Sequence, residues 1–283
     1  METARQTDNE QATLWNGLAG QAWVERQEVL DQMFTPLEEL LVEAVSAAAA
    51  SRVLDVGCGT GSTTLAVARL LGPSGRCTGI DISEPMLAAA RVRAERQGTP
   101  ANFLLADAQA HGFEPASFDM IISRFGVMFF ADSVQAFANL RRAAREDAGL
   151  GFIAWRSAGE NPFMTTAERA AKPLLPNIPA RQSDAPGQFA FADQQRVRRI
   201  LEESGWAGIE IQPIDVVCAF PEEELIAYVT QFGPLGRIFH GMEEATCVRV
   251  IDTVRPAFDP YLEGAEVRFT AACWMVRARA AFS

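Results

Sequence analysis

The chain is poor in the residue types that carry much side-chain chemistry. Its 283 residues include two histidines, two tyrosines, five cysteines and a single lysine, Lys172. Lys172 precedes a proline in a loop-rich segment, which disfavours covalent catalysis by an amine. The cysteines are Cys58, Cys77, Cys218, Cys247 and Cys273. No two of them have the spacing of a zinc site or a redox dithiol, so we expect reduced thiols and no metal centre.

Positive charge and long apolar segments are also scarce. Lysine and arginine number 25 against 36 aspartates and glutamates, which gives a formal net charge of -11. A protein that wraps nucleic acid must neutralise phosphates, so this balance disfavours DNA and RNA as main partners, and anionic lipid equally. No run reaches the length of a membrane span, and the polar start has no apolar signal core. We therefore expect a cytoplasmic protein without membrane insertion; a homodimer is compatible with the sequence.

Short β-rich runs alternate with amphipathic helices through the middle of the chain. The expected strands are 52–56, 75–82, 102–108, 118–123 and 150–157, and the expected helices are 61–71, 84–98 and 133–145. Near-continuous apolar strands that alternate with helices are typical of a parallel sheet covered on both faces. The sequence therefore predicts an α/β fold.

The flanking regions are less regular. Residues 1–50 have apolar residues at helical spacing, and Pro36 indicates the start of a second helix there. We expect the sheet core over 51–156. Residues 157–283 should then supply the last strands, a helix over 192–205 and two loop or helix segments, about 157–191 and 221–263, that form a lid on the substrate side.

A glycine-rich turn follows the first expected strand and reads Asp55-Val56-Gly57-Cys58-Gly59-Thr60-Gly61. The dinucleotide fingerprint has the longer spacing G-x-G-x-x-G and receives a pyrophosphate. Here an acid stands two residues before the first glycine. A carboxylate at that position repels a pyrophosphate and favours a ligand with a positive amine.

Two further acids follow the next two expected strands. Asp81 comes at the end of the second strand and Asp107 at the end of the third. The carboxyl ends of parallel strands open into one crevice, so Asp55, Asp81 and Asp107 should converge there. Each acid alone can equally be a helix cap or turn residue, and the glycines alone a tight turn. Together they indicate a nucleoside with a ribose, an amino-acid tail and no phosphate.

Four stretches carry a family resemblance: VLDVGCGTGSTT, GIDIS, ADAQ and FDMIISRFGVMFF. They resemble the successive motifs of class I S-adenosylmethionine-dependent methyltransferases, above all the branch of the ubiquinone/menaquinone-biosynthesis enzymes and other small-molecule enzymes. The resemblance covers about residues 52–155. It implies a Rossmann-like, seven-stranded, mostly parallel sheet with helices on both faces, an antiparallel last strand at 267–278, N-terminal helices closing over the cofactor, and a helical lid insertion.

The resemblance also implies which residues hold the cofactor, S-adenosyl-L-methionine. Asp55 and the glycine backbone should hold its methionine end, Asp81 its ribose and Asp107 its adenine amino group. Ser123 and Arg124 should contact the methionine moiety through backbone atoms, and Trp15 and Trp23 should lie on the helix that closes over it. The full set is Trp15, Trp23, Asp55, Gly57, Cys58, Gly59, Gly61, Thr64, Asp81, Ile82, Met86, Asp107, Ala108, Ser123 and Arg124.

The methyl acceptor is defined less well by the sequence. Residues 125–130 should form the floor between cofactor and substrate, with Phe125, Met128, Phe129 and Arg156 on the substrate side. Six phenylalanines in the irregular regions favour a small apolar or aromatic acceptor: Phe163, Phe189, Phe191, Phe220, Phe232 and Phe239. His240, in the expected lid, is the candidate general base; a lone lid histidine is as compatible with a structural role.

Three functions stay open at this stage. The favoured one is an S-adenosylmethionine-dependent methyltransferase acting on a small molecule, with methylation at O, N or C undetermined. The alternatives are a nicotinamide-dependent oxidoreductase on a similar sheet, which the glycine spacing and Asp55 disfavour, and a protein that binds S-adenosylmethionine without catalysis. The segment after the fourth strand reads SRFG. It lacks the Asp/Asn-Pro-Pro-aromatic motif of enzymes that methylate nucleic-acid amino groups.

Overall fold

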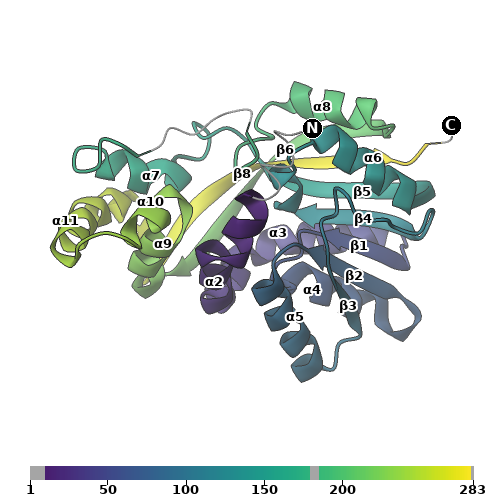
Figure 1. Cartoon of the computed structure of the whole chain (residues 1–283), viewed down its shortest axis with the longest axis horizontal. Helices are drawn as coiled ribbons and strands as arrows, with labels where there is room; N and C mark the ends of the chain where they lie inside the picture. Colours follow the sequence, from purple (N-terminus) through teal and green to yellow (C-terminus); the bar gives the residue numbers. More distant parts are fainter. Residues whose placement is uncertain (1–9, 179–184, 282–283) are drawn as a thin grey trace.

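A mixed β-sheet forms the centre of the computed structural model, which describes residues 10–178 and 185–281 (Figure 1). Its strands are β1 (Arg52–Val56), β2 (Arg76–Asp81), β3 (Ala101–Leu105), β4 (Phe118–Arg124), β5 (Ala144–Trp155), β6 (Ala207–Pro221), β7 (Leu262–Glu263) and β8 (Glu266–Arg279). The strand order is β3-β2-β1-β4-β5-β8-β6, with the two-residue β7 beside β8. Strands β1 to β5 pair in parallel, and β8 runs antiparallel to both β5 and β6. The predicted mostly parallel sheet with an antiparallel last strand is confirmed.

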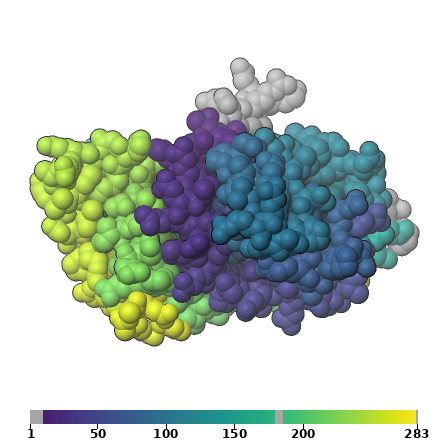
Figure 2. All heavy atoms as spheres, turned by 90° about the horizontal axis from the view of Figure 1, so that it is seen from below, coloured from purple at the N-terminus to yellow at the C-terminus, as the bar shows by residue number. Residues whose placement is uncertain are grey.

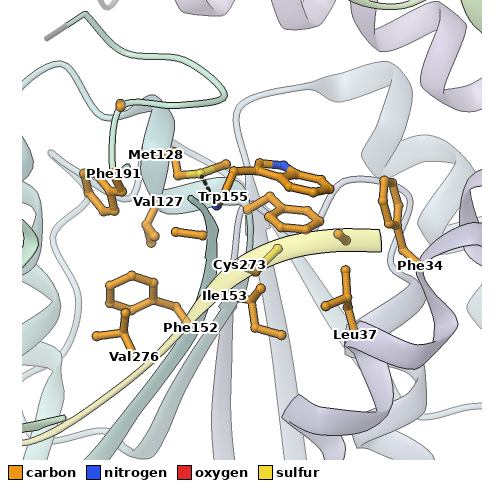
Figure 3. Packing of buried hydrophobic residues seen from close by; sticks show 14 of the residues in the cluster. Phe34, Leu37, Val127, Met128, Phe152, Ile153, Trp155, Phe191, Cys273 and Val276 are labelled. Carbon is orange, nitrogen blue, oxygen red and sulfur yellow. Dashed lines mark hydrogen bonds between the residues drawn. The ribbon is translucent and has the colours of Figure 1, made fainter. Parts of the chain in front are cut away.

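Helices cover both faces of this sheet. On one face lie α3 (Gln27–Ala47) and α4 (Ser62–Leu71), which pack against each other; α6 (Ser133–Ala143) and α8 (Gln194–Glu203) pack together on the opposite face. Successive residues of a strand point to opposite faces. Accordingly, Phe152 of β5 packs against Phe137 of α6, whereas Ile153 lies on the side of Leu37 of α3 (Figure 3). Helix α5 (Glu84–Gln97) covers β3 at the edge of the sheet.

Two local expectations need correction. Pro36 does not begin a helix but lies inside α3, which runs unbroken across it because Leu37 and Leu41 on its buried face are fully packed. Strand β5 begins at Ala144, six residues before the apolar run that predicted it, and α6 correspondingly ends at Ala143. The early start is explained by pairing of Ala144 with Phe118 of β4 across a bulge.

The expected lid consists of helices gathered at one end of the molecule (Figure 1). They are α7 (Pro162–Ala171), α9 (Leu225–Gln231), α10 (Gly233–Phe239) and α11 (Glu244–Val254), with the short 3-10 turns η3 (Glu222–Glu224) and η4 (Arg255–Tyr261). The two irregular regions of the sequence therefore meet in space, since α7 contacts α10, α11 and η4. Helix α11 ends at Val254, before Pro256 and Pro260 of η4, because proline lacks the N–H group that a continuing α-helix needs.

The N-terminal helices lie between this lid and the sheet core. Residues 10–16 are helical and lead into α2 (Leu18–Glu25), which packs against α5. Figure 2 shows the N-terminal segment in purple, wedged between the yellow-green lid and the blue core. Arg26 extends the contact to the lid, donating to Glu224 at 2.9 Å and to Gln231 at 2.9 Å. None of the described helices is long and apolar enough to cross a bilayer; the cytoplasmic location stays a prediction.

Candidate active site

A cavity of about 870 Å³ opens where the carboxyl ends of β1 to β5 face the N-terminal helices and the lid. Its wall includes the glycine turn after β1, the loop after β2, the loop after β3 and the segment after β4. The far side is formed by residues of α7, α9 and α10. One cavity therefore connects the sheet edge, where the sequence predicts the cofactor, with the lid, where it predicts the acceptor.

The glycine turn approaches the neighbouring backbone more closely than any side chain allows. Gly57, Gly59 and Gly61 all have positive φ, at 68°, 55° and 84°. A Cβ atom on Gly57 would lie 2.6 Å from the Cα atom of Gly126, in the segment after β4. The N–H groups of Gly57 and Cys58 both donate to the carbonyl of Ile80, at 2.9 and 3.1 Å. Glycine is needed here because the turn combines left-handed backbone with backbone-to-backbone packing.

Asp81 links this turn to the end of β2. Its Oδ2 accepts a hydrogen bond from the Gly59 N–H at 2.8 Å and its Oδ1 accepts one from the Ser83 N–H at 2.9 Å. The side chain lines the cavity although the residue is only 8% exposed. Burial raises the pKa of Asp81, and the backbone donors act in the opposite direction. A carboxylate has about four acceptor sites, and the backbone donors to Asp81 are Gly59, Ser83 and Ile82, so acceptor capacity remains for a ligand hydroxyl.

The loop after β3 provides the next part of the wall. Asp107 accepts a hydrogen bond from the Gln109 N–H at 2.8 Å and lines the cavity beside the buried Ala108. Ile82 and Met86, from the loop after β2 and the start of α5, line the same region. Four residues of the expected cofactor set, Ile82, Met86, Asp107 and Ala108, thus line the cavity.

Asp55 lies behind the turn and not on the cavity wall. Its side chain is 1% exposed and accepts a hydrogen bond from the Thr64 hydroxyl at 2.6 Å. Burial raises the pKa of Asp55 to about 6, against the opposing effects of the Thr64 hydrogen bond and the Arg124 charge. Of the three carboxylates expected in one crevice, only Asp81 and Asp107 line the cavity. Asp55 instead connects β1 to the start of α4 through its hydrogen bond with Thr64.

Three other residues of the expected cofactor set, Gly61, Thr64 and Ser123, also do not line the cavity. The Ser123 hydroxyl donates to the carbonyl of Val56 at 2.7 Å and accepts from the N–H groups of Gly126 and Val127. Gly61 begins α4 and packs against Ala90 and Phe103. With Thr64, these residues fix the shape of the turn and of the segment after β4. Cys58 and Gly59, by contrast, line the cavity.

Aromatic rings form the floor beyond the turn. Phe125 has a positive φ of 68° and stacks on Trp155 with ring centroids 4.6 Å apart and an interplanar angle of 9°. The Trp155 N–H contacts the Met128 sulfur at 3.4 Å (Figure 3). Phe129 meets the edge of Trp15 at 5.2 Å. All five residues line the cavity, in agreement with the floor expected at 125–130.

The N-terminal tryptophans close the cavity from the side opposite the sheet. Trp15 lies 6.3 Å from Trp23, and Trp23 lies 6.2 Å from Phe232 of the lid. Both tryptophans line the cavity. The Ser83 hydroxyl donates to the Trp15 carbonyl at 2.6 Å, which fixes this helix to the loop that carries Asp81.

Several lining residues were not predicted. Phe34 lies on an expected N-terminal helix and Trp155 in an expected strand, but neither was predicted as a lining residue, and the lid contributes groups that the sequence could not orient. Three of the six phenylalanines noted above, Phe163, Phe189 and Phe232, line the cavity; Phe191, Phe220 and Phe239 do not. The unpredicted lining residues include Phe34, Trp155, Met164, Glu168, Tyr228, Arg237 and Phe258. The sequence predicts the lid from its two irregular segments, and the phenylalanines there indicate only its apolar character.

Two predicted acceptor-side residues lie away from the cavity. His240 follows α10, is exposed and does not line the wall. Arg156 is paired with Glu160 at 2.9 Å and with Asp215 at 3.0 Å, and packs over Trp274 at 5.7 Å. We therefore base no step of catalysis on either residue. Within 10–178 and 185–281, no group of three histidine, cysteine or acidic residues could hold a metal ion.

Comparisons with known proteins agree with this geometry. The sequence model of the family described as a methyltransferase domain matches residues 53–147. The ubiquinone/menaquinone biosynthesis C-methyltransferase UbiE of Hahella chejuensis is 30% identical over 168 residues, which cover 56% of this chain and 67% of UbiE. The chain belongs to the methyltransferase domain family. The resemblance inferred from the four motifs is thus confirmed.

Other relatives of this methyltransferase domain are matched over a smaller share of their length. Aklanonic acid methyltransferase DauC of Streptomyces sp. (strain C5) is 36% identical over 138 residues, 47% of this chain and 61% of DauC. Nocamycin O-methyltransferase of Saccharothrix syringae is 31% identical over 144 residues, 50% of each protein. The chain thus spans about half to three fifths of the length of these two relatives. Among solved structures, the YcgJ protein of Bacillus subtilis has a TM-score of 0.56 at 17% identity, covering 87% of this chain and 98% of YcgJ, which shows a shared fold.

Proposed function

We propose that the chain is an S-adenosylmethionine-dependent methyltransferase acting on a small apolar or aromatic molecule. The observation that carries this proposal is one continuous cavity that joins the sheet edge, where Asp81 and Asp107 line the wall, to the aromatic residues under the lid. Three relatives of the chain bear methyltransferase names, and their named substrates are small molecules.

The cofactor fits the sheet edge by the chemistry of its wall. Asp81 has acceptor capacity left for a ribose hydroxyl, and Asp107 can accept from the adenine amino group. Ile82 and Met86 offer apolar surface to the adenine ring. The turn after β1 leaves room for a tail that lies against the backbone of Gly57 and Gly59. A pyrophosphate fits poorly between these carboxylates, because two negative charges would face it.

When bound, the cofactor supplies a methyl group already activated by a sulfonium. The residues of this chain then have to align the acceptor with that methyl group and exclude water. Trp155 and Phe125 stack on each other beside the end of β5, and Phe163, Tyr228 and Phe232 line the same cavity from the lid. Flat apolar walls on two sides favour a planar acceptor, which they would hold by stacking and by apolar burial.

The position methylated follows from the acceptor and not from the fold. The relatives include a C-methyltransferase and an O-methyltransferase. A general base is needed only where the nucleophile must lose a proton. Glu168 and Tyr228 are ionisable groups on the lid part of the wall, and both already interact with other residues. A carbon or oxygen nucleophile that is ionised in solution would need neither.

A mass-spectrometric screen tests the proposed function. The chain is incubated with S-adenosylmethionine and panels of phenols, amines, quinones and keto acids, and products are searched for the mass of one added methyl group. We expect methylated products among planar aromatic acceptors, and their loss when Trp155 is changed to Ala. Binding of S-adenosylmethionine without product in any panel would favour the non-catalytic alternative. Tighter binding of NADH would favour the oxidoreductase alternative.

A further inference from the structure

The glycine turn after β1 lies along one face of α5. A Cβ atom on Gly59 would lie 3.7 Å from the Met86 sulfur, and one on Gly61 would lie 2.9 Å from the Ala90 Cβ atom. Met86, Ala90 and Arg93 have the i, i+4, i+7 spacing of one helix face. The helix face against which the turn packs therefore also carries the Arg93 side chain.

Arg93 binds the turn from the side away from the cavity. Its Nη1 atom donates a hydrogen bond to the Thr60 carbonyl at 2.7 Å. Thr60 lines the cavity, whereas Arg93 does not. The N–H group of the same peptide unit, that of Gly61, donates to the Cys58 carbonyl at 2.9 Å. Both polar groups of the peptide between Thr60 and Gly61 are thus fixed, one by the turn itself and the other by Arg93.

This peptide has little else to fix its orientation. Gly59 and Gly61 flank Thr60, with φ values of 55° and 84°. Glycine adopts positive and negative φ about equally, so a peptide beside it can rotate at low steric cost. A hydrogen bond from a charged guanidinium is stronger than one between neutral groups, and a buried carbonyl that loses its donor is costly. The Arg93 contact therefore favours one orientation of this peptide over the others.

Arg93 is itself held by an acid of α3. Its Nη2 atom donates to Asp31 Oδ2 in an ion pair, with the two side chains 15% and 21% exposed. A carboxylate orients the planar guanidinium as well as neutralising it. Arg93 thus joins α5, the glycine turn and α3 in one contact.

A second acid on α3 acts beside the turn and not on it. Glu38 accepts a hydrogen bond from the Ser62 hydroxyl at the start of α4. It also forms an ion pair, at 3.9 Å, with Arg124, which lines the cavity at the end of β4 with a side chain that is 10% exposed. Within residues 10–178 and 185–281, the charged side chains that hydrogen-bond to the backbone of the turn are Asp81 and Arg93. Asp81 does so from the cavity and Arg93 from the opposite side.

We propose that Arg93, held by Asp31, is a positioning residue for the cofactor site: it fixes the peptide between Thr60 and Gly61 and so keeps the glycine turn in its binding-competent shape. The proposal rests on the proposed function and extends it to two residues that do not line the cavity. When a binding-competent conformation is populated only part of the time, the apparent affinity falls by that fraction. Loss of Arg93 should therefore weaken cofactor binding although the residues of the cavity wall are unchanged.

Calorimetric titration with S-adenosylhomocysteine, at a temperature where every variant is folded, provides the test. Arg93→Met keeps an apolar side chain of similar length and removes the donors, and we expect it to bind about 10-fold more weakly. Arg93→Lys keeps one charged donor for the Thr60 carbonyl and should stay within about 3-fold of the unaltered chain. The proposal is overturned if Arg93→Met binds as tightly as the unaltered chain, or if Arg93→Lys binds no better than Arg93→Met.

A double-mutant cycle tests whether Asp31 acts through Arg93. Asp31→Asn removes the ion pair, and we expect it to weaken binding of S-adenosylhomocysteine about 3-fold in the unaltered chain. In the Arg93→Met background it should cause no further weakening, because the guanidinium that it orients is gone. A general structural effect of Asp31 would instead weaken binding by the same factor in both backgrounds, and that result would overturn the proposal.

Arg156→Met is the matched control. The Arg156 side chain is 13% exposed and is paired with Glu160 and Asp215, but it lies away from the turn and outside the cavity. Its substitution should lower the free energy of unfolding and leave the affinity for S-adenosylhomocysteine unchanged. A loss of affinity equal to that of Arg93→Met would show that affinity follows overall stability, and would overturn the proposal. Failure of the unaltered chain to bind S-adenosylhomocysteine would instead overturn the proposed function.

Discussion

The Asp81 carboxylate accepts a hydrogen bond from the Gly59 N–H at 2.8 Å, across 22 residues of sequence. The expected ribose ligand and the glycine turn are therefore parts of one structure. The second oxygen of Asp81 is bound in the same way by the Ser83 N–H, at the start of α5. Any change at Asp81 should thus affect the cofactor through two routes, the lost ribose contacts and a less fixed turn.

Replacing Asp81 by Ala should weaken cofactor binding by about 2–4 kcal/mol, because it removes a charged acceptor of a ribose hydroxyl. Titration calorimetry with S-adenosylhomocysteine measures this loss. Asp119→Ala is the control: Asp119 also accepts backbone N–H bonds, from Ser51 and Arg52, but at the opposite end of the strands. We expect the control to cost stability and to keep cofactor affinity. Equal affinities of the two variants would contradict the ribose assignment.

Gly57→Ala should destabilise the fold more than an ordinary glycine substitution. The new Cβ would need a positive φ and would lie 2.6 Å from the Gly126 Cα, so we expect a loss of about 2–5 kcal/mol in the free energy of unfolding. Gly98 has a similar φ of 60°, and a Cβ atom there would have no heavy atom within 4 Å. Gly98→Ala should therefore lower the free energy of unfolding only by the strain of an alanine at positive φ, about 1–2 kcal/mol. Urea unfolding curves of the two variants measure the difference, and similar losses would show that the close approach is unimportant.

Asn16→Ala should shorten the time for which cofactor stays bound. The Asn16 side chain donates to the Ile82 carbonyl at 2.9 Å and accepts from the Glu84 N–H at 3.0 Å, so it fixes the N-terminal helix to the loop after β2. Losing about 1 kcal/mol of this contact should raise the dissociation rate of S-adenosylhomocysteine about 5-fold. Stopped-flow fluorescence can follow the release, since Trp15 lines the cavity. Asn102→Ala, at an exposed position of β3, is the control; an unchanged rate in Asn16→Ala would show that the helix does not limit release.

Asp55 should make the stability of the ligand-free protein fall as pH rises. Burial raises its pKa from 3.8 to about 6. The stabilising contribution of protonated Asp55 is therefore complete below about pH 3.8 and is lost as pH rises through about 6. Between pH 4 and 7.5 the unaltered chain should lose on the order of 3 kcal/mol that Asp55→Asn does not lose. Unfolding curves at the two pH values measure this, and parallel pH dependence of both proteins would contradict the assigned burial effect.

The fold and the nucleoside end were largely predictable from the sequence because both depend on local signals. Apolar runs marked the strands, and the rule that parallel strand ends meet at one edge placed Asp81 and Asp107 together. The same rule wrongly placed the Asp55 side chain in the crevice, because a position at a strand end does not determine which way a side chain points. The prediction that a helix begins at Pro36 is also wrong, because tertiary packing of α3 outweighs the local preference of proline for the start of a helix.

For the acceptor end of the cavity, the sequence predicted only that the lining is apolar and aromatic. Trp155, Phe163 and Tyr228 come from segments far apart in the sequence, and no local pattern records that they face one cavity. The sequence places His240 in the lid and so makes it a candidate general base, but the structure shows it exposed at the end of α10. The contact of Arg93 with the glycine turn was also beyond the sequence, because it depends on how α5 packs against that turn.

Competitive titration of the purified chain with S-adenosylhomocysteine and NADH tests the central assignment most directly. The wall of Asp81, Asp107 and the short glycine turn should accept the phosphate-free nucleoside at one site per chain and leave NADH unbound up to millimolar concentration. Saturable binding of NADH at that site, displaced only weakly by S-adenosylhomocysteine, would contradict the assignment.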